Sequence, residues 1–119
     1  MRIATITRGK SVLWRGVALT KTPFERMRGI MFSRPGSFPP TVIAFPRPGR
    51  RRNAIHSFFC PVFDAVFLDA TGHVVDVIPQ VKPNNPLIVP KAPASSVLEL
   101  PAGDAGRKSI RIGEVLVVL

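Results

Sequence analysis

The chain has 119 residues, a formal net charge of +10 and a single cysteine, and 45 % of its residues are hydrophobic. The length is typical of one domain, so we expect residues 1–119 to form a single folded unit, and the apolar content excludes wholesale disorder. The longest apolar run is far shorter than the ~20 residues of a membrane-spanning helix. Residues 1–8 lack the apolar stretch of a secretion signal, and a lone Cys60 makes neither an internal disulfide nor a zinc cluster. We therefore expect a cytoplasmic protein with no metal, cofactor or membrane span.

The positive charge is concentrated in the first half of the chain. Residues 1–52 contain 12 Lys or Arg and one acid, whereas residues 53–119 contain 5 basic and 6 acidic residues. The densest basic segment holds Arg47, Arg50, Arg51 and Arg52 around a Pro-Gly pair, which predicts an exposed turn because buried guanidinium groups need partners. Such a field attracts anionic polymers such as nucleic acid or an acidic glycan. The alternative is a solvated loop that only aids solubility, since no cluster of stacking aromatic residues accompanies it.

The first elements in chain order are a predicted hairpin and a helix. Residues 1–7 and 11–18 are rich in β-formers and flank a Gly-containing turn. Thr-Pro-Phe-Glu at residues 22–25 is a capping box with Pro at the first helical position, and it predicts a helix over residues 23–32. The apolar stripe of this helix is expected to pack into the core; it consists of Phe24, Met27, Ile30 and Met31.

Short strands dominate the remainder. Runs rich in Val, Ile and Phe, divided by Pro and Gly, predict strands at residues 41–45, 54–59, 63–69, 73–78, 87–89, 96–100 and 114–119. The segment 104–112 is a connector whose structure the pattern does not define. The sequence thus predicts a mainly β (α+β) fold: a mostly antiparallel, curled or barrel-like sheet of about eight short strands with one short helix.

Several motifs together resemble family 192 of the domains of unknown function. They are Gly-Ile-Met-Phe at 29–32, Ile-His-Ser-Phe-Phe at 55–59, Asp-Ala-Val-Phe-Leu-Asp at 64–69, Leu-Glu-Leu-Pro-Ala-Gly at 98–103 and Ile-Arg-Ile-Gly-Glu at 110–114. The resemblance covers about four fifths of the chain and implies a compact, mostly β fold with no assigned activity. This chain departs from the family pattern at Cys60, where Met is common, and at Pro61, which interrupts the central segment.

The candidate chemical site consists of His56, Cys60 and Asp64, spaced four residues apart. If residues 54–59 and 63–68 pair as a hairpin with an odd-length loop, His56 and Asp64 lie on the same face. Asp64 would then orient the imidazole, and an exposed Cys60 beside it could act as a nucleophile. The alternatives are a structural His56–Asp64 pair and a small buried cysteine.

The leading functional hypothesis is a non-enzymatic binding domain for an anionic ligand or polymer, using Arg47, Arg50, Arg51 and Arg52 with His56 and Asp64. One alternative is a hydrolase-like enzyme that uses His56 with Asp64 and, less readily, Cys60. The other alternative is a structural module that binds an unidentified protein partner through an exposed strand edge.

Overall fold

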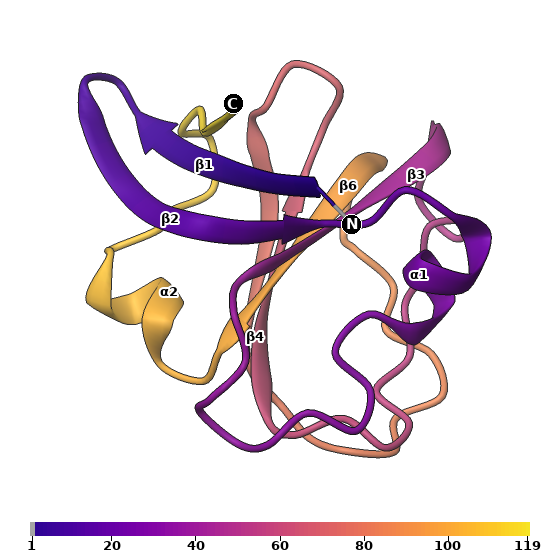
Figure 1. The fold of residues 1–119 in the computed structure, drawn as a ribbon. Helices are drawn as coiled ribbons and strands as arrows, with labels where there is room; N and C mark the ends of the chain where they lie inside the picture. Colours follow the sequence, from indigo (N-terminus) through magenta and orange to yellow (C-terminus); the bar gives the residue numbers. More distant parts are fainter. Residues whose placement is uncertain (1) are drawn as a thin grey trace.

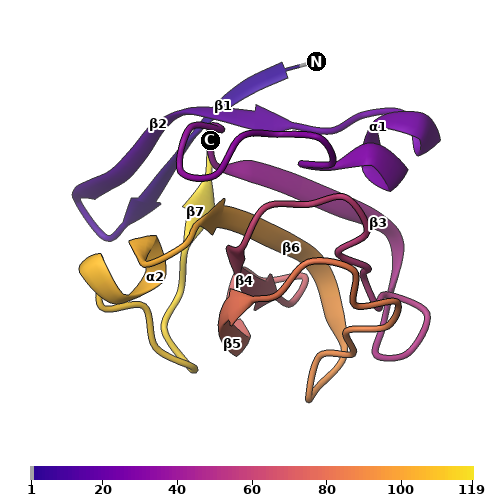
Figure 2. The same ribbon diagram turned by 90° about the horizontal axis from the view of Figure 1, so that it is seen from below.

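A computed structural model describes residues 2–119 and shows one mixed sheet with two short helices (Figures 1 and 2). The strand order is β5-β4-β6-β3-β2-β1-β7. The strands are β1 (Arg2–Arg8), β2 (Ser11–Leu19), β3 (Thr41–Gly49), β4 (Phe63–Leu68), β5 (Val74–Val81), β6 (Ala94–Pro101) and β7 (Val117–Val118), and the helices are α1 (Pro23–Arg28) and α2 (Asp104–Arg107). The predicted mainly β architecture is confirmed, with seven strands rather than about eight.

The β1–β2 hairpin forms where the β-forming runs predicted it, with the first residue of the expected strand lying outside the described chain. Arg8 pairs with Ser11 across a turn in which Gly9 has a φ of 58°. Among the described strands, the one parallel pairing joins the end of β2 to the start of β3, where Ala18 is opposite Thr41. The chain between β2 and β3 contains α1 and the coil after it. This connection leaves α1 at one end of the sheet (Figure 1).

The most completely buried strand is β4, which lies second in the sheet, between β5 and β6. All six residues of β4 are buried, because β5 and β6 pair with it on either side and both of its faces are covered. The β4–β5 turn is held by Asp69, whose carboxylate accepts hydrogen bonds from Thr71 and from the His73 amide. This is the antiparallel turn that the Asp-Ala-Thr-Gly segment predicts.

The sheet curls until its two ends approach each other. Val74, at the start of β5, donates a backbone hydrogen bond to Glu114 and accepts one from Gly113, just before β7. The strand ladder itself is not continuous there, since His73 and Val115 form only an isolated bridge. The molecule is therefore a curled, incompletely closed sheet with α1 and α2 at opposite ends (Figure 2).

The core divides into two clusters on the two faces of the sheet. Leu98 and Leu100 of β6 belong to the cluster that includes Trp14, whereas Val97 belongs to the cluster under α1 that includes Ile30. Because side chains alternate along a strand, Glu99 shares the face of Val97. A carboxyl group is thus placed on the otherwise apolar face beneath α1.

The structure corrects three predictions about individual elements. Helix α1 ends at Arg28 rather than at residue 32, because Gly29 follows with a φ of 48° and a ψ of −121°. Its apolar stripe is only partly core: Ile30 is buried, but Phe24 and Met27 are 65 % and 59 % exposed. Residues 54–59 and 87–89 do not form the predicted strands; the two segments meet only in an isolated bridge between Ile55 and Ile88.

Candidate functional site

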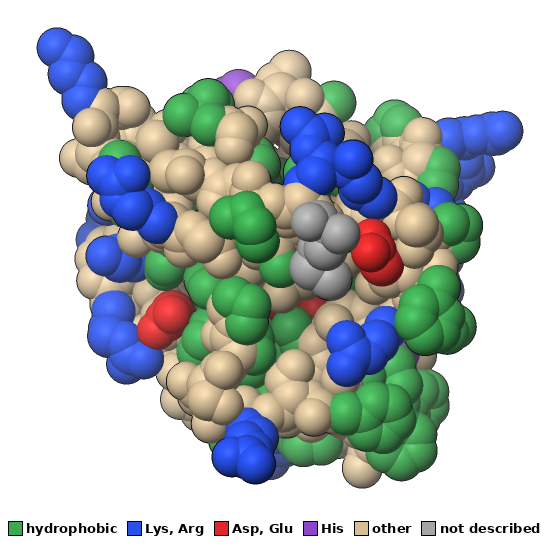
Figure 3. All heavy atoms as spheres, viewed as in Figure 1, with side chains coloured by type: hydrophobic (Ala, Val, Ile, Leu, Met, Phe, Trp, Pro, Cys, Tyr) green, Lys and Arg blue, Asp and Glu red, His purple; other side chains and the backbone are tan. Residues whose placement is uncertain are grey.

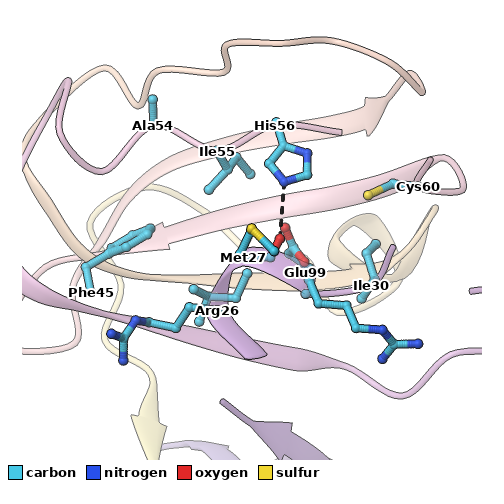
Figure 4. A pocket seen from close by; sticks show the side chains of 12 residues that line it. Arg26, Met27, Ile30, Phe45, Ala54, Ile55, His56, Cys60 and Glu99 are labelled. Atoms are coloured by element: carbon cyan, nitrogen blue, oxygen red, sulfur yellow. Dashed lines mark hydrogen bonds between the residues drawn. The ribbon is translucent and has the colours of Figure 1, made fainter. Parts of the chain in front are cut away.

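The described chain contains a pocket between α1 and the sheet, which we call the α1 pocket. Its volume is about 220 Å³ (Figure 4). Four segments line it: residues 26–30 of α1 and the following turn, Ile43 and Phe45 of β3, residues 54–56 together with Cys60, and Glu99 of β6. Its walls are mainly apolar, and its polar groups are few and of different types, which is the usual composition of a small-molecule site.

Glu99 is the buried polar group of this pocket. It is 3 % exposed, and its Oε1 finds no hydrogen-bond partner among the described residues. Burial raises the pKa of Glu99 to about 8, and a hydrogen bond from the Ile30 amide acts in the opposite direction. At neutral pH the carboxyl group is therefore mostly protonated and can donate a hydrogen bond, since the charged form would lose more solvation than the Ile30 amide restores.

Gly29 allows the backbone after α1 to pass directly over this carboxyl group. A Cβ at Gly29 would lie 2.9 Å from Oε1 of Glu99 and 3.2 Å from the Ile43 side chain. The positive φ of Gly29 also disfavours other residues. The glycine of the Gly-Ile-Met-Phe motif and the glutamate of the Leu-Glu-Leu motif therefore meet at one point of the pocket.

His56 bridges the two sides of the pocket mouth. Its Nδ1 accepts a hydrogen bond from the Phe58 amide at 3.1 Å, so Nε2 carries the proton and donates to the Met27 carbonyl at 3.2 Å. Figure 4 shows the ring pointing from the 54–60 segment toward Met27 and Glu99. Both ring nitrogens are engaged, and the imidazole ties α1 to the loop that carries Phe58.

Cys60 lines the same pocket as His56. Its side chain is buried, and its thiol donates to the Phe58 carbonyl at 3.4 Å. Burial, followed by the nearby Glu99, raises the pKa of Cys60 to about 12. The thiolate that nucleophilic catalysis requires is accordingly scarce at neutral pH.

The expected pairing of His56 with Asp64 is wrong. Asp64 lies in β4, where its Oδ1 accepts from the Gln80 amide at 2.9 Å and its Oδ2 accepts from Gly103 and Ala105 at 2.9 and 3.0 Å. The prediction failed because β4 pairs with β5 and β6 instead of with residues 54–59. Asp64 holds the β6–α2 junction and does not line the α1 pocket.

The predicted basic turn begins in the last residues of β3, where Arg47 lies, and it is exposed, as its composition indicates. Arg47, Arg50, Arg51 and Arg52 all face solvent. Buried Asn53 shapes the turn by donating to the carbonyls of Arg47 and Ala94, both at 2.7 Å. These arginines lie outside the α1 pocket, which is lined instead by Arg26 and Arg28.

The sequence analysis missed Glu99 as well as the two arginines of α1. The signal for Glu99 was present, because a single carboxylate interrupts the apolar run from Val97 to Leu100 in a strand. Arg26 and Arg28 carried no comparable signal, since charged residues beside an apolar helical stripe are usually solvated.

In the described residues, no group of three or more His, Cys, Asp and Glu side chains could hold a metal ion. None of the helices between residues 2 and 119 combines the length and apolar character needed to cross a bilayer.

The fold defines the class: a small β protein built on a single curled, mixed sheet with two short helices. The chain belongs to family 192 of the domains of unknown function (DUF192, Uncharacterized ACR), whose pattern matches residues 4–118. This confirms the resemblance that the motifs indicated.

Three known proteins are similar to the chain. A UPF0127 protein of Thermococcus sibiricus is 32 % identical over 111 residues, which is 92 % of this chain and 70 % of that protein. A protein of unknown function from Novosphingobium aromaticivorans has a TM-score of 0.80 at 19 % identity, covering 97 % of this chain and 83 % of its own. A candidate transcription regulator from Sinorhizobium meliloti has a TM-score of 0.78 at 18 % identity, covering 98 % and 92 %. The two solved structures establish the fold alone.

Proposed function

We propose that this chain is a binding domain for a small amphiphile that carries an acidic oxygen, such as a carboxylate, and an apolar body. The observation that carries the proposal is the buried, unpartnered Oε1 of Glu99 in a pocket with mainly apolar walls. A buried polar atom without a partner is uncommon in a folded protein and usually has a specific reason. A bound ligand would supply the missing hydrogen bond.

The charge of the pocket favours an acidic ligand over a basic one. Arg26 and Arg28 line the pocket and attract an anion, while the protonated Glu99 carboxyl can donate a hydrogen bond to it. A cation would meet the repulsion of both guanidinium groups and would need Glu99 in its unfavourable charged form. The apolar side chains of the walls, including Ile43 and Phe45, accommodate a hydrocarbon body.

The proposal is tested with hexanoate and hexylamine as probes of opposite charge. Hexanoate should shift the backbone NMR signals of Gly29, Ile30 and His56, and hexylamine should not. Because ionised Glu99 repels the anion, affinity for hexanoate should fall as pH rises through about 8. Glu99→Leu should abolish the shifts, and Arg50→Ser with Arg51→Ser serves as a control that leaves them intact. Equal binding of the two probes, or binding that survives Glu99→Leu, contradicts the proposal.

A second candidate function is binding of an anionic polymer by the basic turn. It is supported by four exposed arginines in residues 47–52, none of which takes part in the ion pairs found among the described residues. The name of the Sinorhizobium meliloti relative is compatible with nucleic acid as that polymer. Affinity for a DNA oligonucleotide should fall steeply with salt, and Arg50→Ser, Arg51→Ser and Arg52→Ser together should flatten the log–log slope by about three. A slope near zero for the unaltered chain discards this function.

The hydrolase-like alternative is less well supported by the geometry. His56 has both ring nitrogens engaged, Asp64 is held elsewhere, and Cys60 is a buried thiol. The reduced state of a lone cysteine is compatible with the cytoplasm, which we propose as the location.

A further inference from the structure

An exposed apolar patch lies beside the α1 pocket and shares Met27 with its lining, and we call it the aromatic patch. It consists of Phe24, Met27, Phe32, Phe58 and Phe59, with exposures of 65 %, 59 %, 69 %, 40 % and 64 %. Figure 3 shows hydrophobic side chains gathered over the α1 side of the molecule, with Lys and Arg side chains beside them. Large apolar side chains gathered in this way indicate a surface that is covered by something else.

Contacts connect four members of the patch, and the fifth, Phe24, lies on α1 one turn before Met27. Phe32 and Phe59 stack, with ring centroids 5.4 Å apart and an interplanar angle of 17°. The Phe32 amide donates to the Phe59 carbonyl at 2.8 Å, which fixes the two turns to each other. The His56 ring contacts the Phe58 ring and donates a hydrogen bond to the Met27 carbonyl, so it links the loop that carries Phe58 to α1.

The backbone holds the two stacked rings out in solvent. Phe32 and Phe59 have φ values of 64° and 57°, a conformation that costs energy for a residue with a side chain. Neither ring is used in the core, since both are more than three fifths exposed. Two strained turns that present a pair of aromatic rings are typical of a surface that acts on a ligand or partner.

The charge around the patch determines what can cover it. Residues 21–34 contain four basic side chains and only one acid, Glu25, whose carboxylate accepts hydrogen bonds from the Lys21 and Thr22 amides at the start of α1. Arg28 and Arg34 are exposed beside the aromatic residues. A second copy of the chain would bring the same positive charges against these, so self-association through this face is opposed.

We propose that the aromatic patch docks on an anionic lipid bilayer. Phe side chains partition into the boundary between headgroups and acyl chains, and neighbouring arginines pair with anionic headgroups. The exposed Phe rings come from α1 and from two turns, so they can enter a bilayer surface at several points at once. Met27 belongs both to the patch and to the lining of the α1 pocket, so in this orientation the pocket lies close to the bilayer. The inference stands apart from the proposed ligand, because it rests on exposed residues and not on Glu99.

The test is co-sedimentation of the full chain with phosphatidylcholine vesicles that contain or lack phosphatidylserine. Binding should require phosphatidylserine, and Phe32→Ser with Phe59→Ser should weaken it about tenfold or more, because two rings no longer enter the bilayer. Arg28→Ser should weaken it about fivefold. Urea unfolding of each variant establishes that it is folded.

The matched control removes charge elsewhere. Arg50→Ser with Arg51→Ser should reduce vesicle binding less than the phenylalanine changes do, because the basic turn lies outside the aromatic patch. The proposal is overturned if the chain does not sediment with phosphatidylserine vesicles. It is also overturned if the basic-turn variant loses more binding than the phenylalanine variant, which would indicate attraction by charge alone. A dimer in sedimentation equilibrium that Phe32→Ser and Phe59→Ser dissociate, without vesicle binding, would assign the patch to a second copy.

Discussion

Glu99 is the residue whose environment departs furthest from what its chemistry prefers. Its neighbours in β6 belong to the two apolar clusters, and its Oε1 lies in a pocket instead of against a donor. A protein that needed only stability would gain by replacing such a group with an apolar side chain of similar size. We infer that Glu99 lowers the stability of the fold and that its role is to bind a ligand.

Glu99 makes stability depend on pH in a specific direction. Its pKa is raised from 4.5 to about 8, so the folded state retains a proton between these values and the unfolded state does not. The free energy of unfolding should therefore fall with rising pH across this window, by on the order of 1 kcal/mol per pH unit. Glu99→Gln should flatten this slope, measured by urea unfolding at several pH values. An unchanged slope would show that Glu99 is not the titrating group.

Gly29 provides a second prediction at the residue scale. Gly29→Ala adds both backbone strain and a Cβ contact with Glu99, and it should lower the free energy of unfolding by about 2–4 kcal/mol. Gly9→Ala is the matched control, because Gly9 also has a positive φ but nothing within 4 Å of the added Cβ. Urea unfolding should show a clearly larger loss at Gly29. Equal losses would mean that the contact with Glu99 contributes nothing.

At the scale of elements, the sequence predicted best where local chemistry decides the structure. The capping box of α1 is present as expected, with the Thr22 hydroxyl accepting from Glu25 and the Glu25 carboxylate accepting from Thr22. The β1–β2 and β4–β5 turns also form where Gly and Asp indicated them. These features depend on neighbouring residues, so a single sequence is sufficient to identify them.

The sequence predicted less well where long-range pairing decides. Residues 54–59 are rich in β-formers, yet β4 is already paired on both sides and leaves them no free strand edge. Phe24 and Met27 have helical spacing, but α1 has only 6 residues, less than two turns, and the chain packs through Ile30 beyond its end. The α1 pocket combines four distant segments, and no local pattern reveals which of them meet.

The separation of His56 from Asp64 leads to a prediction about energetic coupling. Asp64→Asn should cost about 2–4 kcal/mol, because an amide group cannot accept all three backbone bonds that the carboxylate accepts. His56→Ala should cost about 1 kcal/mol. The two losses should add within about 0.5 kcal/mol in the double variant, since the side chains share no partner. If the two losses differ from additivity by more than about 1 kcal/mol in urea unfolding, His56 and Asp64 interact and the separation seen in the structure is contradicted.

At the scale of the whole molecule, a structural junction lies at one end of the curled sheet and the candidate binding features lie at the other. Asp64 holds the β6–α2 junction at one end, where the chain turns toward β7. The α1 pocket, the aromatic patch and the arginines of α1 occupy the other end. The basic residues of segment 21–34 lie at the end where we place binding, whereas Arg8 bonds to the Lys108 carbonyl and to Glu114 at the other end.

The central claim is that Glu99 is a protonated donor that an acidic ligand engages. The most direct measurement is the ¹³C chemical shift of the Glu99 carboxyl carbon, followed against pH with and without hexanoate. We expect a titration midpoint near 8 in the free protein, moving upward when hexanoate binds, because the anion favours the neutral carboxyl. A midpoint near 4.5, or one that hexanoate leaves in place, would contradict the account.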